Sequence, residues 1–175
     1  MISKEGANVD YDGGCHCGNV QVRVNLSKAP EDFAVRACTC SFCRSHKPRM
    51  ISDPVGLLSV AANDWDLVRF YRFGTRTCDF LLCSLCGVFI AAVSDANEQS
   101  PRAVLNVNCL KDRARFSETP AMHDFDGETL DTRLTRRRVN WMPTVIEAVA
   151  GDLRAMRELG NRLDGLPARS RPQRQ

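Results

Sequence analysis

Seven of the nine cysteines in this 175-residue chain lie in three short clusters. They are Cys15-His16-Cys17-Gly18, Cys38-Thr39-Cys40-Ser41-Phe42-Cys43 and Cys83-Ser84-Leu85-Cys86-Gly87. Thiols separated by one or two residues can converge on a single soft cation, and zinc is the metal most often bound in this way. Clusters that share a metal must meet in space, so this pattern constrains the fold more than any other feature.

Disulfides are the alternative use of these cysteines, and the sequence favours them less. Disulfide frameworks are typical of small secreted chains, whereas residues 1–6 lack the apolar core of a signal peptide. Two of the clusters place their thiols on either side of one residue, which suits a shared metal better than an internal disulfide. We therefore predict metal ligation.

Composition excludes few functions. The chain is 43% hydrophobic and carries a formal net charge of +3, which is too small to indicate a partner. No apolar run approaches the ~20 residues that a membrane helix needs, so we expect a cytoplasmic protein without a membrane partner.

The run Arg136-Arg137-Arg138 lacks accompanying aromatic residues, so we expect a solvated basic face rather than nucleic-acid binding. The sequence does not indicate an oligomeric state.

Hydrophobic periodicity predicts a mainly β protein. Val20, Val22, Val24 and Leu26 alternate with polar residues, which is typical of a strand with one buried face. Shorter apolar runs predict further strands at residues 33–37, 57–61, 67–73, 80–82, 88–93 and 103–110. The fold class expected is twisted antiparallel sheets with zinc-binding loops and short helical turns. One such turn begins at Ser41 as its N-cap and ends before Pro48.

We expect four segments along the chain. Residues 1–11 form a lead-in and residues 12–143 form the zinc domain. Residues 144–163 are predicted to form an amphipathic C-terminal helix, because apolar residues recur there at helical spacing. Residues 164–175 are rich in Pro, Arg, Ser and Gln and are predicted to be disordered.

Counting ligands divides the seven clustered thiols between two zinc ions. Tetrahedral zinc takes four ligands, so the two-thiol clusters together complete one closed, structural site. Its ligands are Cys15, Cys17, Cys83 and Cys86. The third cluster supplies only three ligands and leaves one coordination position open, as a catalytic zinc requires. Its ligands are Cys38, Cys40 and Cys43.

Other candidate ligands receive different interpretations. His46 lies three residues beyond Cys43, so it could close the second site, and both metals would then be structural. We interpret Cys78 and Cys109 as packing residues. His123 is interpreted as a solvated loop residue.

The three cysteine motifs resemble those of the glutathione-dependent formaldehyde-activating enzyme family, which also includes centromere protein V. The resemblance spans roughly residues 12–110 and rests on Gly13-Gly14-Cys15-His16-Cys17-Gly18-Asn19-Val20, on Cys38 to Arg44 and on Cys83 to Gly87. It implies an Mss4-like fold and two zinc ions with the division of ligands given above. It also implies carbon–sulfur lyase activity, in which formaldehyde and glutathione form S-hydroxymethylglutathione.

One departure concerns the substrate. Family members commonly have a glycine soon after the three-cysteine motif, and this chain has Ser45-His46-Lys47-Pro48-Arg49 instead. We expect Arg44, Lys47 and Arg49 either to hold the carboxylates of a glutathione-like thiol or to be solvated surface charges. His46 is the candidate proton shuttle in the reaction.

Two other functions remain alternatives. The chain could be a non-enzymatic two-zinc interaction module, because fold alone does not decide function. It could also be a redox or metal sensor in which Cys78 or Cys109 pairs with a clustered thiol.

Overall fold

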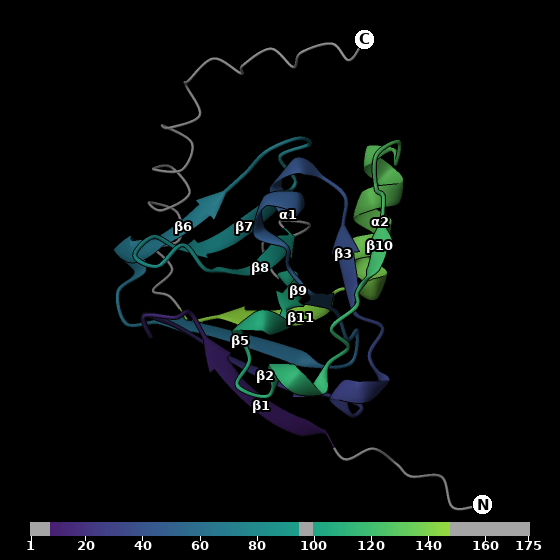
Figure 1. Cartoon of the computed structure of the whole chain (residues 1–175). Helices are drawn as coiled ribbons and strands as arrows, with labels where there is room; N and C mark the ends of the chain where they lie inside the picture. Colours follow the sequence, from purple (N-terminus) through teal and green to yellow (C-terminus); the bar gives the residue numbers. More distant parts are fainter. Residues whose placement is uncertain (1–7, 95–99, 148–175) are drawn as a thin grey trace, which may run out of the picture.

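The computed structural model describes residues 8–94 and 100–147. Within these residues, eleven strands form one open sheet, with two α-helices beside it (Figure 1). The strands are β1 Val9–Gly14, β2 Val20–Leu26, β3 Arg36–Cys38, β4 Met50–Ile51, β5 Leu57–Ala62, β6 Val68–Tyr71, β7 Cys78–Cys83, β8 Phe89–Ser94, β9 Arg102–Asn106, β10 Ala121–His123 and β11 Met142–Ile146. The helices are α1 Ser41–His46 and α2 Leu130–Asn140, and four 3₁₀ turns cover Pro30–Asp32, Trp65–Leu67, Val107–Cys109 and Arg113–Arg115.

The sheet branches at β9. One path runs in the order β1-β2-β5-β11-β9-β4-β3-β10, and a second path leaves β9 through β8 to β7 and β6. Most neighbouring strands are antiparallel, but β11 runs parallel to β5 and β10 runs parallel to β3. The predicted mainly β class is confirmed, and the sheet is mixed rather than purely antiparallel.

The alternation in β2 produces the expected one-sided burial. Val20, Val22, Val24 and Leu26 are all buried, whereas Gln21 and Arg23 between them are exposed. The buried side chains belong to the larger core, which also takes side chains from β1, β5, β8 and β9. Period-two patterning therefore fixes which face of this strand is turned inward.

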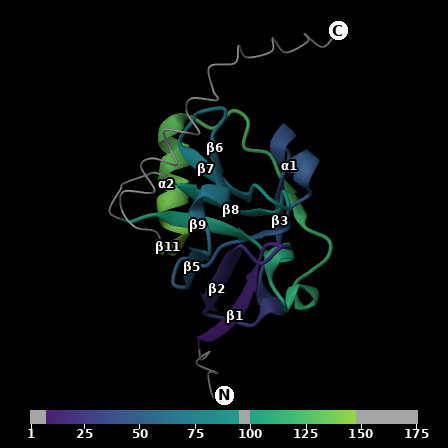
Figure 2. The same cartoon turned by 90° about the vertical axis from the view of Figure 1, so that its left-hand side faces the viewer.

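A smaller core lies on the other face of the sheet. Consecutive residues of β8 separate the two cores, because Ala91 packs in the larger one and Ala92 in the smaller one. Phe42 of α1 and Trp141 at the end of α2 both pack in the smaller core. In Figure 2, α1 lies at one side of the view and α2 at the other, with β7 and β8 between them. This face of the sheet carries the three-cysteine segment.

Three segments form elements that the sequence did not predict. The basic stretch around residues 132–139 forms α2, which Thr129 caps by accepting a hydrogen bond from the backbone N–H of Thr132. Residues 144–146, where the predicted C-terminal helix begins, belong to β11 because they pair with β5. The rest of that predicted helix from residue 148, and the predicted tail, lie outside the described residues. The first strand starts at Val9, inside the predicted lead-in.

None of the described helices is long and apolar enough to cross a membrane.

Candidate metal centres

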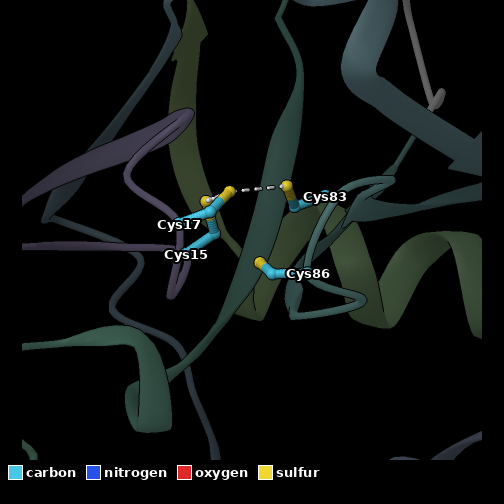
Figure 3. A group of neighbouring side chains, drawn as sticks. All are labelled: Cys15, Cys17, Cys83 and Cys86. Carbon is cyan, nitrogen blue, oxygen red and sulfur yellow. Dashed lines mark hydrogen bonds between the residues drawn. The ribbon is translucent and has the colours of Figure 1, made fainter.

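The loops after β1 and β7 bring four cysteines together. The Sγ atoms of Cys15, Cys17, Cys83 and Cys86 all lie within 4.8 Å of one another (Figure 3). Cys17 lies where the two loops meet. Its sulfur is 3.5 Å from that of Cys15 and 3.5 Å from that of Cys83. These are the four residues that the sequence assigns to a closed site.

Each loop is shaped by a glycine that follows its cysteines. Gly18 has φ +82° and Gly87 has φ +72°, a left-handed conformation that costs other residues energy. Gly87 N–H donates to the Cys83 carbonyl at 2.9 Å, which closes the second loop. In the first loop the backbone N–H of Val20 donates to Cys15 Sγ at 3.2 Å.

Backbone donors favour the thiolate form at Cys86. Burial raises the pKa of this thiol, but hydrogen bonds from the backbone N–H groups of Val88 and Cys17, together with those of the Cys83 and Cys17 side chains, lower it to about 6. A thiolate is the form that binds metal. The loop therefore stabilises its sulfur in the charge state that a cation requires.

The four-sulfur geometry fits zinc and does not fit disulfides. Bonded sulfurs are about 2.05 Å apart, and none of the nine cysteines forms a disulfide. Zinc–sulfur bonds of about 2.3 Å in a tetrahedron place neighbouring sulfurs about 3.8 Å apart. The 3.5 Å contacts and the 4.8 Å limit of this cluster bracket that spacing. The cluster can hold a metal ion, and its donor set is compatible with zinc.

The second cluster is built where β3 passes into α1. The Sγ atoms of Cys38, Cys40 and Cys43 lie within 4.8 Å of one another. Cys38 ends β3 and Cys43 lies within α1. Cys40 is the N-cap of that helix and accepts from the backbone N–H of Cys43, whereas the sequence predicted Ser41 as the cap. A cysteine fills this position because its sulfur can serve the helix end and the cluster together.

Hydrogen bonding within this cluster favours one negative charge. Hydrogen bonds from Cys38 and Cys43 lower the pKa of the Cys40 thiol to about 2. The same contacts raise the pKa of Cys43. The three sulfurs together form an anionic set of ligands. This set can hold a second metal ion and is compatible with zinc.

His46 lies on α1 but outside the sulfur cluster. Its Nδ1 lies 2.9 Å from the carbonyl oxygen of Phe42, one turn earlier, and its ring stacks on that of Phe42 with centroids 4.1 Å apart. Because a carbonyl oxygen only accepts, Nδ1 is the protonated nitrogen and Nε2 carries the free lone pair.

The three basic residues named from the sequence are placed differently. Arg44 and Lys47 are exposed, and Lys47 ends α1 in the left-handed conformation, with φ 46°. Arg49 instead donates from Nε to Asn108 Oδ1 at 2.7 Å, from Nη1 to the Phe116 carbonyl and from Nη2 to the Arg113 carbonyl. A substrate carboxylate would have to replace these contacts, so the geometry favours a structural role for Arg49.

Cys78, Cys109 and His123 are the other residues for which the sequence predicted a role. Cys78 and Cys109 are buried and lie outside both clusters, and burial raises the pKa of Cys109 to about 12. His123 is exposed as predicted, but it belongs to strand β10 rather than to a loop. Its Cα is the register partner of Cys38, and its carbonyl accepts from Thr39 N–H. No sequence signal indicated this neighbour, because the β3–β10 pairing joins distant segments.

Comparison with known proteins identifies the family. The model of the glutathione-dependent formaldehyde-activating enzyme family matches residues 10–127, which is more than half of the chain. A crystal structure of a Rhodobacter sphaeroides protein shares 27% sequence identity with this chain, covers 64% of this chain and 99% of its own, and superimposes with a TM-score of 0.48. No curated protein matches the chain. The matched region includes all three cysteine motifs, and the chain therefore belongs to the glutathione-dependent formaldehyde-activating enzyme family.

Proposed function

We propose that the protein is a zinc-dependent carbon–sulfur lyase that acts on a glutathione-like thiol adduct of formaldehyde or a related carbonyl compound. One observation carries this proposal. One sulfur cluster has four members, and the other has three, with no fourth Cys, His, Asp or Glu ligand atom joining it among residues 8–94 and 100–147. A three-ligand centre leaves a coordination position for a substrate.

The two centres receive different roles. Cys15, Cys17, Cys83 and Cys86 supply a full tetrahedral set, so the first metal is structural. Cys38, Cys40 and Cys43 would hold the second. Zinc bound there supplies a Lewis acid that lowers the pKa of an incoming thiol and holds its sulfur near the carbonyl carbon.

The segment around the second centre stabilises charge through its backbone. Cys40 N–H donates to Cys38 Sγ at 3.4 Å, and Cys43 N–H donates to Cys40 Sγ at 3.5 Å. These donors compensate part of the negative charge that three thiolates carry. The Phe42 ring anchors α1 to the smaller core and keeps the three sulfurs in one arrangement.

His46 is the proposed proton shuttle. With Nδ1 protonated and bonded to the Phe42 carbonyl, Nε2 is the nitrogen that can accept the thiol proton. The sulfur then forms a bond to the carbonyl carbon, and the same proton passes to the carbonyl oxygen to give a hydroxyl group. The reverse sequence releases thiol and carbonyl compound, so no oxidant or reductant is needed.

The proposed thiol partner is glutathione or a close analogue, because the family name refers to glutathione. Arg44 and Lys47, both exposed on or next to α1, are available to meet its carboxylates. Reduced thiols are typical of the cytoplasm, where we place the reaction.

Cobalt substitution tests this function. In the cobalt-loaded protein, glutathione should change the visible spectrum, because a fourth sulfur joins the three-cysteine centre. Cys40→Ser should abolish the change while leaving one metal bound. The alternative, a non-enzymatic two-zinc interaction module, requires no change in the spectrum at any glutathione concentration, and that result would overturn the lyase proposal.

A further inference from the structure

Arg36 is a half-buried cation beside the three-cysteine centre. It lies in β3 two residues before Cys38, and alternate residues of a strand point to the same face. Its register partner in β4 is Met50, which packs in the smaller core beneath α1 and α2. The Arg36 and Cys38 side chains therefore lie on the same face, with their Cα atoms about 7 Å apart.

The guanidinium of Arg36 has no hydrogen-bond or ion-pair partner among the described residues. Arg36 is half-buried, and the neighbouring charge that acts on it is the positive charge of Arg136 rather than that of a carboxylate. Guanidinium groups that are withdrawn from water are normally paired. Because Arg36 is half-buried and not paired within the described residues, its guanidinium is available to an anion from outside them.

Helix α2 places more positive charge than negative charge next to Arg36. Arg136 lies over the Phe125 ring at 4.1 Å and pairs with Glu128 through Nε at 2.6 Å and Nη2 at 2.9 Å. Arg133 Nε lies 3.7 Å from the same carboxylate. Glu128 thus pairs with two guanidinium groups, and no ion pair joins it to Arg36 among the described residues.

We propose that Arg36, supported by Arg136, forms an anion subsite that binds a carboxylate of the thiol substrate whose sulfur docks at Cys38, Cys40 and Cys43. This inference rests on the proposed function and names the substrate class as thiols that carry a carboxylate. Arginine suits this role because its fork of N–H donors can hold both oxygens of a carboxylate. Arg36 would position the substrate and take no part in bond making.

Thiol affinity in the full-length cobalt-loaded protein tests the subsite. Glutathione and glutathione diethyl ester carry the same thiol, but the ester lacks both carboxylates. We expect the wild type to bind glutathione at least tenfold more tightly than the ester, as judged by the spectral titration. Arg36→Gln should lower this ratio severalfold, leaving only the part that Arg44 and Lys47 contribute, and Arg36→Lys should retain more of it.

A matched control and three outcomes make the test decisive. Arg138 lies exposed on α2, and Arg138→Gln removes the same charge from the protein without touching this face, so its ratio should equal that of the wild type. Metal content and circular dichroism establish that the variants are folded. The ratio of glutathione affinity to ester affinity in the wild type is measured without any substitution, so it tests the subsite even if a variant fails to fold. Equal affinities for the two thiols in the wild type would overturn the subsite alone. A ratio that Arg36→Gln leaves intact would also overturn it. Spectra unchanged by both thiols would overturn the open centre on which the subsite depends.

Discussion

The sulfur atoms of Cys17 and Cys83 lie 3.5 Å apart although the two residues are 66 positions apart in the chain. Cys17 follows β1, which lies at one end of the main strand order, and Cys83 ends β7, which lies on the branch that leaves β9. No strand pairing joins β1 or β2 to β7 among the described residues. The four-cysteine cluster therefore links two parts of the sheet that hydrogen bonding does not connect directly.

This link predicts that the two clusters respond differently to loss of one ligand. Cys17→Ser removes the sulfur at the junction of the two loops, and binding energy at a structural metal is folding energy. We expect Cys17→Ser to lose its cooperative thermal transition. Cys40→Ser removes a ligand from a local segment and should remain folded, with bound zinc falling from about two to about one per chain.

Zinc content by mass spectrometry and unfolding by circular dichroism check both variants. Cys86→Ser should behave like Cys17→Ser, because both sulfurs belong to the same cluster. Retention of a normal transition in Cys17→Ser would contradict a structural role for the four-cysteine centre.

Phe42 gives a prediction about how the three-cysteine segment is held. Its ring contacts Phe80 and Phe89, with centroids 4.7 and 5.1 Å away, in addition to His46. Phe42→Ala should lower the free energy of unfolding by about 2–3 kcal/mol, less than for a fully buried ring, because Phe42 is only half-buried. Urea unfolding of the zinc-loaded protein measures this change.

Tyr71 is the matched control for Phe42. It belongs to the same aromatic group, with centroids 5.8 Å apart, but its side chain is 41% exposed. Tyr71→Ala should therefore cost about 1 kcal/mol or less. Equal losses in the two variants would mean that Phe42 does not anchor α1.

Local patterns made part of this fold predictable. The alternation in β2 shows directly in the sequence which side chains are buried, and the spacing of the clustered cysteines indicates which sulfurs can converge. Glycine after a cysteine pair predicts the left-handed turn that Gly87 adopts. Each of these features depends on residues within one short segment.

Features that depend on distant pairing were not predictable in the same way. Residues 144–146 form a strand because β5 is available beside them, which no local pattern shows. His123 lies beside Cys38 only because β10 runs parallel to β3. The same limit applies to Arg36, whose surroundings come from β4 and α2. The sequence predicts either a substrate ligand or a solvated surface charge for Arg49, but its partners lie more than 55 positions later in the chain.

Replacement of Arg49 should lower the free energy of unfolding without weakening glutathione binding. Its guanidinium ties the chain after α1 to the carbonyls of Phe116 and Arg113. Arg49→Met keeps most of the side-chain length but removes these donors, so the free energy of unfolding should fall by about 2 kcal/mol. Glutathione affinity of the cobalt-loaded protein should stay within about twofold of the wild type. A larger loss of affinity at unchanged stability would restore Arg49 as a substrate ligand.

Glu128 predicts a pH-dependent contribution to stability. Hydrogen bonding from Arg136 lowers the pKa of this carboxyl below its usual value. Its contribution is therefore fully present above the unfolded-state pKa of about 4.3 and is lost as pH falls through the lower folded-state value. Glu128→Gln should cost about 1 kcal/mol at pH 7, and the difference from the wild type should shrink below about pH 4.

Urea unfolding compares the two proteins at each pH at which metal analysis shows that both still hold zinc. Glu118 is exposed, and no interaction partner is found for it among the described residues, so Glu118→Gln is the control with no expected change. A difference between wild type and Glu128→Gln that stays constant down to pH 3 would rule out the ion pair as its source.

The final prediction concerns proton transfer by His46. Its Nδ1 bond to the Phe42 carbonyl leaves Nε2 as the proton acceptor, so replacement should slow the reaction while the metals stay bound. We expect His46→Gln to lower kcat about 100-fold, within the range for loss of a general acid–base group, with little change in KM for the thiol. Adding imidazole should restore part of the rate. His16 is exposed between two ligands of the structural site, so His16→Gln is the control and should retain wild-type kcat. A kcat within twofold of the wild type in His46→Gln would leave His46 with only its stacking contact on Phe42.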